Sequence, residues 1–419
     1  MRVLLMGQHY APEEISGAVL ATEIAEDLVK WGNQVTFLTC APSHPKGIIF
    51  PGYKNWFFRR EEYRGVQVIR IWSYISPQKT FWRRILNYGT FSASTFYGGI
   101  FAERPDVIFS ASPPLPLGLS AWLLSRLWKV PWVLRVEDLY PDAAVAAGLL
   151  KNKRVIAFFA AIERFLYKKA THISVISQGF RNNLIQKNVQ DNKISVTPVW
   201  ADPSAVQPMA KDNEFRNEHG LEGKFVILYA GNIGYNSVLE DVIEAAELLR
   251  AEECIRFVIV GEGVKKASLQ EMVSRYDLHN VDFYPYQPRE KYPEMLAAAD
   301  LGLVTLTEDS YYTSLPSKVF NIMASGRPIL AITPPSSEIA GLLGSAQCGL
   351  NVAPSSPDKL VEVILTFLQD EQLVTVMGRN GRTVLEEQFS REQCIRMYDR
   401  LFHSLVDTNH ELNGNKMPE

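Results

Sequence analysis

The chain has 419 residues, of which 47% are hydrophobic and 21% charged, and this length predicts two globular domains rather than one. A formal net charge of −3 gives no global basic field, which argues against a nucleic-acid partner bound through its phosphates. Its four cysteines, Cys40, Cys254, Cys348 and Cys394, form no Cys-x-x-Cys pair, so neither a zinc knuckle nor a disulfide framework is expected.

The first half of the chain alternates apolar runs with helical patterns such as 19–31 and 115–128. This alternation predicts a parallel sheet with helices on both faces. The first apolar run is too short for a signal peptide and turns polar at Gln8, so it predicts a buried strand of a cytoplasmic protein. The expected strands cover residues 2–6, 34–39, 66–71, 107–110, 132–136 and 173–176.

A segment rich in proline and small residues, 199–208, interrupts this pattern before it restarts at residue 225. The restart predicts a second sheet of the same kind. Ligands of such doubly wound sheets bind outside the carboxyl ends of the strands, so the site is expected there. The expected strands of this half cover residues 225–230, 256–260, 281–284, 301–306, 328–332 and 349–352.

The segment 314–330 carries the clearest chemical signal, because it follows a strand and opens a short helix at Ser317 and Lys318. Backbone N–H groups at a helix start, together with a cation, suit a diphosphate. A lysine at this place is otherwise unfavourable, since the helix N-terminus is already positive. The turn 231–234 also follows a strand, and its glycines allow backbone to approach a phosphate closely.

The order of Pro316-Ser317-Lys318, Asn321, Met323-Ala324, Gly326 and Pro328 resembles the donor-site helix of family-4 glycosyltransferases. The segments 231–234, 260–263, 296–300 and 378–382 follow the family's usual order as well. The resemblance implies a GT-B fold, in which two Rossmann-like domains face a central cleft. It also implies a retaining transfer of a sugar from a nucleoside-diphosphate sugar. The expected division is an acceptor domain at 1–203, a donor domain at 204–390, and a helix at 391–419 that crosses back to the first domain and ends in a polar tail.

Candidate site residues follow from matching this sequence to the family's motifs. Asp138 and Lys318 are the candidate catalytic residues, the lysine because it can neutralise the leaving diphosphate. For Asp138, a role in capping the following turn stays open as the alternative. The candidate donor-binding residues are Gly17, Gly231, Asn232, Gly234, Gly261, Gly263, Pro316, Ser317, Lys318 and Asn321.

Three departures from the family's pattern are visible in the sequence. Many members carry two glutamates where this chain has Thr313 and Asn321; Asn321 can still hydrogen-bond a ribose, but Thr313 cannot supply the charge. Tyr235 stands near the place of a phosphate-binding cation, so Lys318 is expected to act alone. Glu137 precedes Asp138 where many members have a histidine.

No cofactor and no metal are expected, since the sequence contains no Asp-x-Asp and no clustered metal ligands. His9 and His44 lie on loops after strands and are interpreted as bystanders. The resembled family is usually explained by front-face attack, with the departing phosphate as the base. That mechanism would account for the absence of an obvious catalytic base.

The N-terminal half narrows the resemblance to the colanic-acid glycosyltransferase subgroup, through segments 10–13, 42–45, 60–68 and 87–92. This implies a lipid-linked glycan acceptor, used in bacterial surface polysaccharide synthesis at the cytoplasmic membrane face. Residues 79–102 combine basic and aromatic residues, which predicts a peripheral membrane contact. An ordinary helix packed on the sheet is the alternative for this stretch.

Two other functions stay open at this point. A nucleotide-sugar 2-epimerase of the same fold would need acid and base side chains, which Thr313 and Asn321 do not provide. A sugar-nucleotide-binding protein without activity is the other alternative. The identity of the nucleotide base, the sugar and the oligomeric state does not follow from the sequence.

Overall fold

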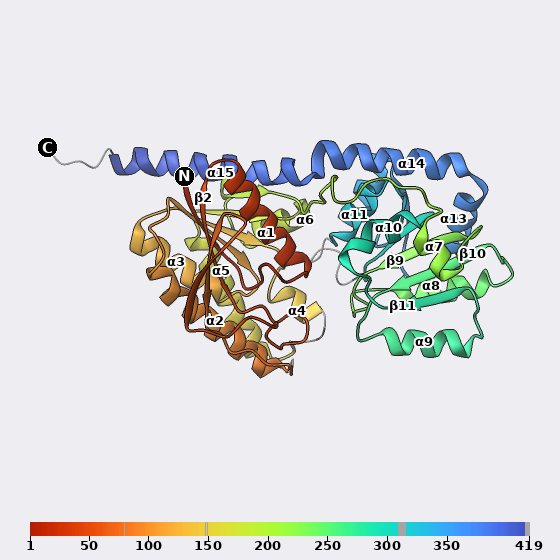
Figure 1. Cartoon of the computed structure of the whole chain (residues 1–419), viewed down its shortest axis with the longest axis horizontal. Coiled ribbons are helices and arrows are strands. Elements are labelled where there is room, and N and C mark those ends of the chain that lie inside the picture. Colours follow the sequence, from red (N-terminus) through yellow and green to blue (C-terminus); the bar gives the residue numbers. More distant parts are fainter. Residues whose placement is uncertain (79, 147, 149, 309–315, 415–419) are drawn as a thin grey trace. The chain divides into compact units, whose positions relative to one another are not determined.

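The computed structural model describes residues 1–78, 80–146, 148, 150–308 and 316–414. The chain divides into two compact units. Unit 1 holds Met1–Val145, Leu150–Pro198 and Cys394–Glu419, and unit 2 is built mainly from Val199–Gln393. Each unit is a parallel sheet with helices on both faces, which confirms the predicted α/β class (Figure 1).

Unit 1 contains an eight-stranded sheet in the order β3-β4-β2-β1-β5-β6-β7-β8. All pairs are parallel except β3 with β4. The sequence prediction missed β3 and the three-residue strand β8. The charged sequence of β3, FRREEY, is typical of an exposed edge strand rather than a buried one. The strands are β1 (Arg2–Met6), β2 (Gln34–Cys40), β3 (Phe58–Tyr63), β4 (Val66–Ile71), β5 (Val107–Ser112), β6 (Trp132–Val136), β7 (His172–Val175) and β8 (Ile194–Val196).

The helices of unit 1 form two layers. Helix α1 (Ser16–Lys30) and the part of α15 (Arg391–Gly414) from Cys394 onward cover one face of the sheet. Helices α2 (Phe81–Ile100), α3 (Leu117–Trp128) and α5 (Lys153–Lys169) gather on the other (Figure 1). In α15, Tyr398 packs edge-on against Phe109 of β5 and contacts Arg135 of β6. The remaining helices are α4 (Asp142–Ala146), α6 (Gln178–Gln186) and the 3-10 turn η1 (Asp191–Lys193).

Unit 2 contains a six-stranded parallel sheet in the order β11-β10-β9-β12-β13-β14. Strands β10 and β11 are added on one side of β9, and strands β12 to β14 on the other, so the strand order switches between β9 and β12. Ligands of doubly wound sheets bind at such a switch point. The strands are β9 (Phe225–Ala230), β10 (Ile255–Val260), β11 (Val281–Tyr284), β12 (Leu301–Thr305), β13 (Ile329–Ile332) and β14 (Gly349–Val352). The helical elements are α7 (Glu214–His219), α8 (Leu239–Leu248), α9 (Lys266–Arg275), η2 (Arg289–Lys291), α10 (Tyr292–Ala297), α11 (Lys318–Ala324), α12 (Glu338–Ala346), α13 (Pro357–Gln369), α14 (Glu371–Val384) and η3 (Leu385–Phe389).

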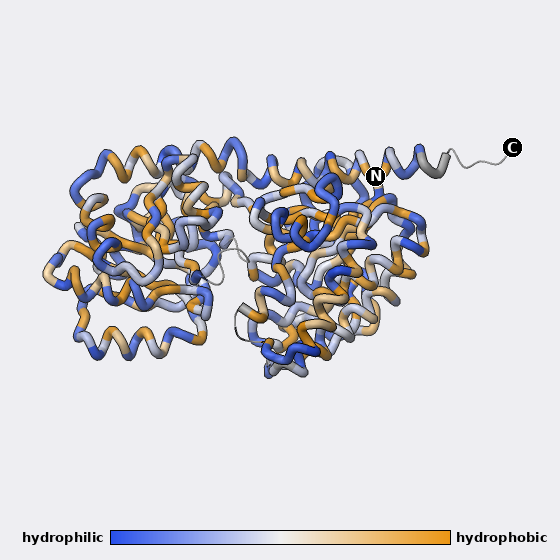
Figure 2. The backbone as a smooth tube through the Cα atoms, turned by 180° about the vertical axis from the view of Figure 1, so that it is seen from behind, coloured by the Kyte–Doolittle hydropathy of each residue, from blue (hydrophilic) through white to orange (hydrophobic). Residues whose placement is uncertain are grey.

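Apolar side chains from the strands and from the inner faces of the helices fill the core of unit 2. Along the backbone, hydrophobic strands alternate with helices in which hydrophobic and hydrophilic residues recur at helical spacing (Figure 2). Two polar residues are fixed inside this core. Asp300, at the start of β12, accepts hydrogen bonds from Arg216 at 2.6 Å and from the Val226 N–H at 2.8 Å.

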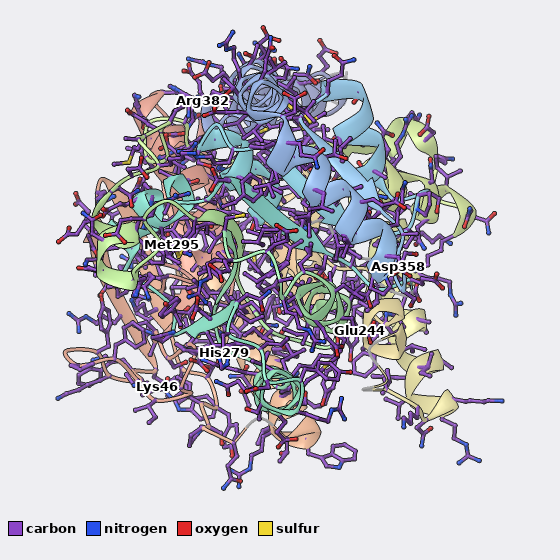
Figure 3. All side chains as sticks on the ribbon, turned by 90° about the vertical axis from the view of Figure 1, so that its right-hand side faces the viewer. Lys46, Glu244, His279, Met295, Asp358 and Arg382 are labelled. Carbon is purple, nitrogen blue, oxygen red and sulfur yellow. The ribbon has the colours of Figure 1, made fainter. Side chains whose placement is uncertain are left out.

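The segment after Pro198 is held firmly within unit 2 by Arg382 of α14, which is labelled in Figure 3. The Arg382 guanidinium donates to the carbonyls of Pro203 (2.9 Å), Val206 (2.7 Å) and Ala324 (2.6 Å). A Cβ on Gly378 would lie only 2.1 Å from the carbonyl oxygen of Gly326. Packing against α11 and the residue Gly326 that follows it therefore explains why glycine stands at 378 and arginine at 382.

Candidate functional site

Two glycine loops meet at the carboxyl edge of the unit 2 sheet, one after β9 and one after β10. The Gly231 N–H donates to Val260 O at 2.9 Å, and the Ile233 N–H donates to Glu262 O at 2.9 Å. A Cβ on Gly261 would lie 1.9 Å from Gly231 O, and one on Gly263 would lie 2.2 Å from Ile233 O. These two glycines are required because the loops approach each other backbone to backbone, whatever ligand they hold.

Lys318, the first residue of α11, lies beside the loop after β9. Its Nζ atom is 3.6 Å from the centroid of the Tyr229 ring, and a Cβ on Gly231 would be 2.9 Å from the same Nζ. The φ of Gly231 is 151°, a conformation that residues with a side chain rarely adopt. The structure thus brings together two predicted donor-site residues, Gly231 and Lys318, and adds Tyr229 beneath the ammonium group.

The electrostatic surroundings of Lys318 differ from those of the neighbouring lysines. Lys265 pairs with Glu240 at 2.9 Å and Lys266 with Glu262 at 2.7 Å. Within the described ranges, Lys318 has no carboxylate within ion-pair distance. Burial lowers its pKa to about 7, because nothing compensates the lost hydration of the ammonium group. An arriving anion would supply the missing partner.

Asn232 and Gly234 complete the loop after β9. The Tyr229 hydroxyl donates to the carbonyl of Asn232 at 2.7 Å. Ser237 donates to the carbonyl of Gly234 through its N–H at 3.2 Å and its hydroxyl at 2.8 Å. Both carbonyls are therefore engaged within the loop, which fixes its conformation.

Pro316, Ser317 and Asn321 lie at the start of α11. The Pro316 and Ser317 carbonyls accept the first N–H groups of the helix, at 3.2 Å and 3.1 Å. Asn321 hydrogen-bonds with Tyr292 of α10, a tyrosine whose pKa burial raises to about 12. The amide is thus held against α10, while Thr313 lies outside the described residues.

In unit 1, Gly17 and Glu137 lie close to each other at the carboxyl ends of the strands. A Cβ on Gly17 would be 4.0 Å from Glu137 Oε2, and Arg135 Nε donates to Glu137 Oε1 at 2.7 Å. These three residues line a cavity of about 60 Å³. The glutamate that stands where many relatives have a histidine is therefore held by a buried arginine.

Asp138 lies next to Glu137, and Glu137 rather than Asp138 lines the cavity. Loss of hydration and, second, the charge of Glu137 raise the pKa of the Asp138 carboxyl above its usual value. Because much of Asp138 is open to solvent, water offsets part of this shift. Its backbone carbonyl accepts the Tyr140 N–H at 3.0 Å, so it also shapes the turn that follows β6.

Sequence reasoning missed several members of these sites. Tyr229 and Tyr292 have no signal of their own, because one ends an apolar strand and the other opens a short helix. Glu13 was also passed over, although the structure pairs it with His9 at 2.7 Å and places His9 in the lining of the unit 1 cavity. The only available signal was their spacing of four residues after a buried strand.

Known families match most of the chain. The model described as "Glycosyl transferase 4-like domain" matches residues 17–200, and the model described as "Glycosyl transferases group 1" matches residues 211–384. A protein of Escherichia coli K12 described as "Putative colanic acid biosynthesis glycosyl transferase WcaI" is 31% identical over 411 residues, which cover 95% of this chain and 98% of that protein.

Solved structures agree at the level of the fold. Sucrose-phosphate synthase from Thermosynechococcus elongatus has a TM-score of 0.74 at 16% identity, covering 97% of this chain and 100% of the other. The Anabaena protein HepE in complex with UDP-glucose has a TM-score of 0.71 at 14% identity, with 96% and 100% covered. From the family models and the extent of the identity to WcaI, we conclude that this chain belongs to the family-4 glycosyltransferases of the GT-B fold.

Proposed function

We propose that this glycosyltransferase moves a sugar, with retention of its anomeric configuration, from a nucleoside-diphosphate sugar to a lipid-linked glycan in bacterial surface polysaccharide synthesis. The name of WcaI supports the class of product, and the UDP-glucose held by HepE supports the class of donor. We place the reaction in the cytoplasm, at the inner face of the plasma membrane.

The observation that carries the donor class is the isolated charge of Lys318. Its Nζ lies beside Gly231 and above the Tyr229 ring, and no carboxylate of the described chain neutralises it. A diphosphate leaving group develops negative charge as the bond to the sugar breaks, and a fixed cation stabilises that charge without rearranging. Lys318 suits this role better than Lys265 or Lys266, which already have carboxylate partners.

In the proposed step, the bond between the anomeric carbon and the diphosphate oxygen breaks, while the acceptor oxygen bonds to the same face of that carbon. The acceptor proton passes to the departing phosphate oxygen, so the atoms balance without a protein base. Lys318 stabilises the diphosphate. Asp138 is proposed as a second catalytic residue, with a carboxyl whose pKa is raised by lost hydration and by the charge of Glu137. The reaction is proposed to need no metal ion.

The test is calorimetric binding of UDP, GDP, ADP and CMP, with and without magnesium. We expect one nucleoside diphosphate to bind selectively without magnesium, and Lys318→Ala to weaken it about tenfold to a hundredfold, the range of a charged hydrogen bond. Lys291→Ala is the matched control, since Lys291 is an exposed lysine of the same unit paired with Glu218. If no nucleotide binds, the donor class is wrong.

The products separate the alternatives. Release of a nucleoside diphosphate with transfer of the sugar supports the proposal. An epimerised sugar nucleotide would instead identify a 2-epimerase. Binding without turnover would identify a sugar-nucleotide-binding protein.

The membrane contact is proposed to lie on α2. Trp82, Leu86, Tyr97 and Ile100 recur at helical spacing on the outer side of this helix, and Trp82 is 75% exposed. Arg83 and Arg84 follow Trp82 directly, so the helix begins with an aromatic residue flanked by positive charge. Such a surface favours anionic lipid. Within the described part of the chain, no helix has both the length and the apolar character needed to cross a bilayer.

Sedimentation with vesicles tests this contact. We expect binding to vesicles containing anionic lipid, weaker binding to neutral ones, and loss of binding in the double variant Trp82→Ser, Leu86→Ser. Leu248→Ser is the control, because Leu248 is 53% exposed on α8 of unit 2. Equal sedimentation of the double variant and the wild type would show that α2 is not the contact.

A further inference from the structure

A second polar cluster lies in unit 1, in the loop after β1. Glu13 is almost fully buried, with 3% of its side chain exposed. Its Oε1 accepts the backbone N–H groups of Ser43 and His44, both at 2.7 Å, and its Oε2 lies 2.7 Å from His9 Nδ1. Desolvation, the largest effect, raises the pKa of Glu13, but these hydrogen bonds and the charge of His9 outweigh it and hold the pKa below its usual value. Glu13 is therefore a carboxylate at neutral pH.

The carboxylate fixes the state of the histidine. An ionised carboxylate only accepts hydrogen bonds, so His9 Nδ1 must carry the hydrogen. The other ring nitrogen, Nε2, lies on the side of the ring away from Glu13. Among the described residues, Nε2 has no hydrogen-bond partner, and the His9 side chain is 34% exposed. His9 thus presents one ring nitrogen in a fixed orientation.

The His9 side chain lines a small cavity. The cavity measures about 60 Å³ and lies at the carboxyl ends of β1, β5 and β6. A water occupies about 30 Å³ of liquid, and a pocket for a whole small ligand takes about 300 Å³ or more. The space therefore suits a hydroxyl or hydroxymethyl group rather than a sugar ring.

The charges around the cavity decide which ligand it suits. Glu13 is buried and negative, and Glu137, which lines the cavity, is paired with Arg135 at 2.7 Å. A phosphate placed next to His9 would meet the field of Glu13 at short range, which is unfavourable. A neutral hydroxyl can donate or accept a hydrogen bond, so it can bind Nε2 without that cost.

We propose that His9, oriented by Glu13, binds a hydroxyl group of the acceptor glycan in this cavity, as a positioning residue that sets acceptor affinity. The inference rests on the proposed function, because it assumes that a sugar acceptor binds to unit 1. It assigns to His9 a role in the acceptor site, separate from donor binding at Lys318. It involves no covalent step and leaves the acceptor proton to the departing phosphate.

The experiment uses the full chain, a radiolabelled nucleotide sugar and the membrane fraction of the native host as the source of acceptor. His9→Ala should lower kcat/KM for the membrane acceptor about tenfold, mainly through KM, which corresponds to one lost hydrogen bond. The Kd of the donor nucleotide should stay within about twofold, and this measurement separates an acceptor role from a donor role, because Gly17, a candidate donor-binding residue, lines the same cavity. His9→Gln should retain most of the activity, because its side-chain amide reaches the position of Nε2 and can hydrogen-bond the same hydroxyl.

His44→Gln is the matched control. The His44 ring lies edge-on to His9, but its contact with Glu13 is through the backbone N–H, which the substitution keeps. The control should match the wild type in acceptor KM. Unchanged acceptor KM in His9→Ala, or a donor Kd weakened more than tenfold, would overturn the assignment. If the wild type transfers no sugar to the membranes, the proposed function fails instead, and donor binding shows this separately.

Discussion

Replacing Lys318 by methionine should stabilise unit 2 while weakening its affinity for the donor. The ammonium group is held next to Tyr229 and Gly231 with no carboxylate partner in the described chain, and burial lowers its pKa to about 7. Methionine has nearly the same length, carries no charge and keeps the contact with the aromatic ring. The substitution therefore removes an unfavourable charge and preserves the packing.

The size of the effect follows from the pKa. In the unfolded chain the lysine titrates near its usual value, so the folded state loses about 4 kcal/mol at pH 7 by holding it at a pKa of about 7. Lys318 is only half-buried, and solvent that reaches the ammonium reduces this figure. We expect a gain of about 1 to 2 kcal/mol in the free energy of unfolding, or several degrees in Tm.

The pH dependence of the stability gain distinguishes the removal of a buried charge from better packing. Below the folded pKa of about 7 the penalty is complete, and it disappears as pH rises towards the unfolded value near 10.5. The advantage of Lys318→Met should therefore be largest at or below pH 7 and vanish by about pH 10. Thermal and urea unfolding at several pH values, together with nucleotide calorimetry, measure both effects. A variant that is less stable at pH 7, or that still binds the diphosphate normally, would refute the reasoning.

Two further predictions concern the same edge of the sheet. Donor affinity should fall about tenfold per pH unit between about pH 7 and 9, because binding requires Lys318 to take up a proton. Calorimetry with a nucleotide sugar should show that the donor affinity of Lys318→Met does not change with pH over this range. Gly261→Ala should cost about 3 kcal/mol of stability, since its Cβ would lie 1.9 Å from Gly231 O at a φ of 154°. As a control, Gly341→Ala in α12 should gain up to about 1 kcal/mol, because a Cβ there would meet no atom within 4 Å. A similar urea midpoint for the two alanine variants would contradict the close approach of the loops.

The meeting of Lys318 with Gly231 could be expected from the sequence. Both follow strands of one parallel sheet, and the carboxyl ends of such strands share an edge. Tyr229 could not be predicted as their neighbour, because its position at the end of an apolar strand is equally consistent with the core. Whether its ring faces the core or the loop depends on the packing of α11, which the local pattern does not contain.

Other contacts depend on parts of the chain that are far apart in sequence. Asn321 meets Tyr292 because α10 and α11 lie on the same face of the sheet, and no local pattern links them. The charge of Glu13 is stabilised by backbone N–H groups 30 residues further along the chain, at Ser43 and His44. Strand β3 was missed because an edge strand can be largely charged. Sequence periodicity predicts buried elements better than it predicts such long-range polar contacts.

The interlocked loops after β9 and β10 have a thermodynamic consequence for ligand binding. A loop that becomes ordered on binding loses conformational entropy, at about 1 to 2 kcal/mol for each residue fixed. Here the backbone bonds from Gly231 to Val260 and from Ile233 to Glu262 already hold both loops in one conformation. The free energy of contact with a donor can therefore appear almost entirely as affinity, and donor binding to this edge should show a small entropy loss.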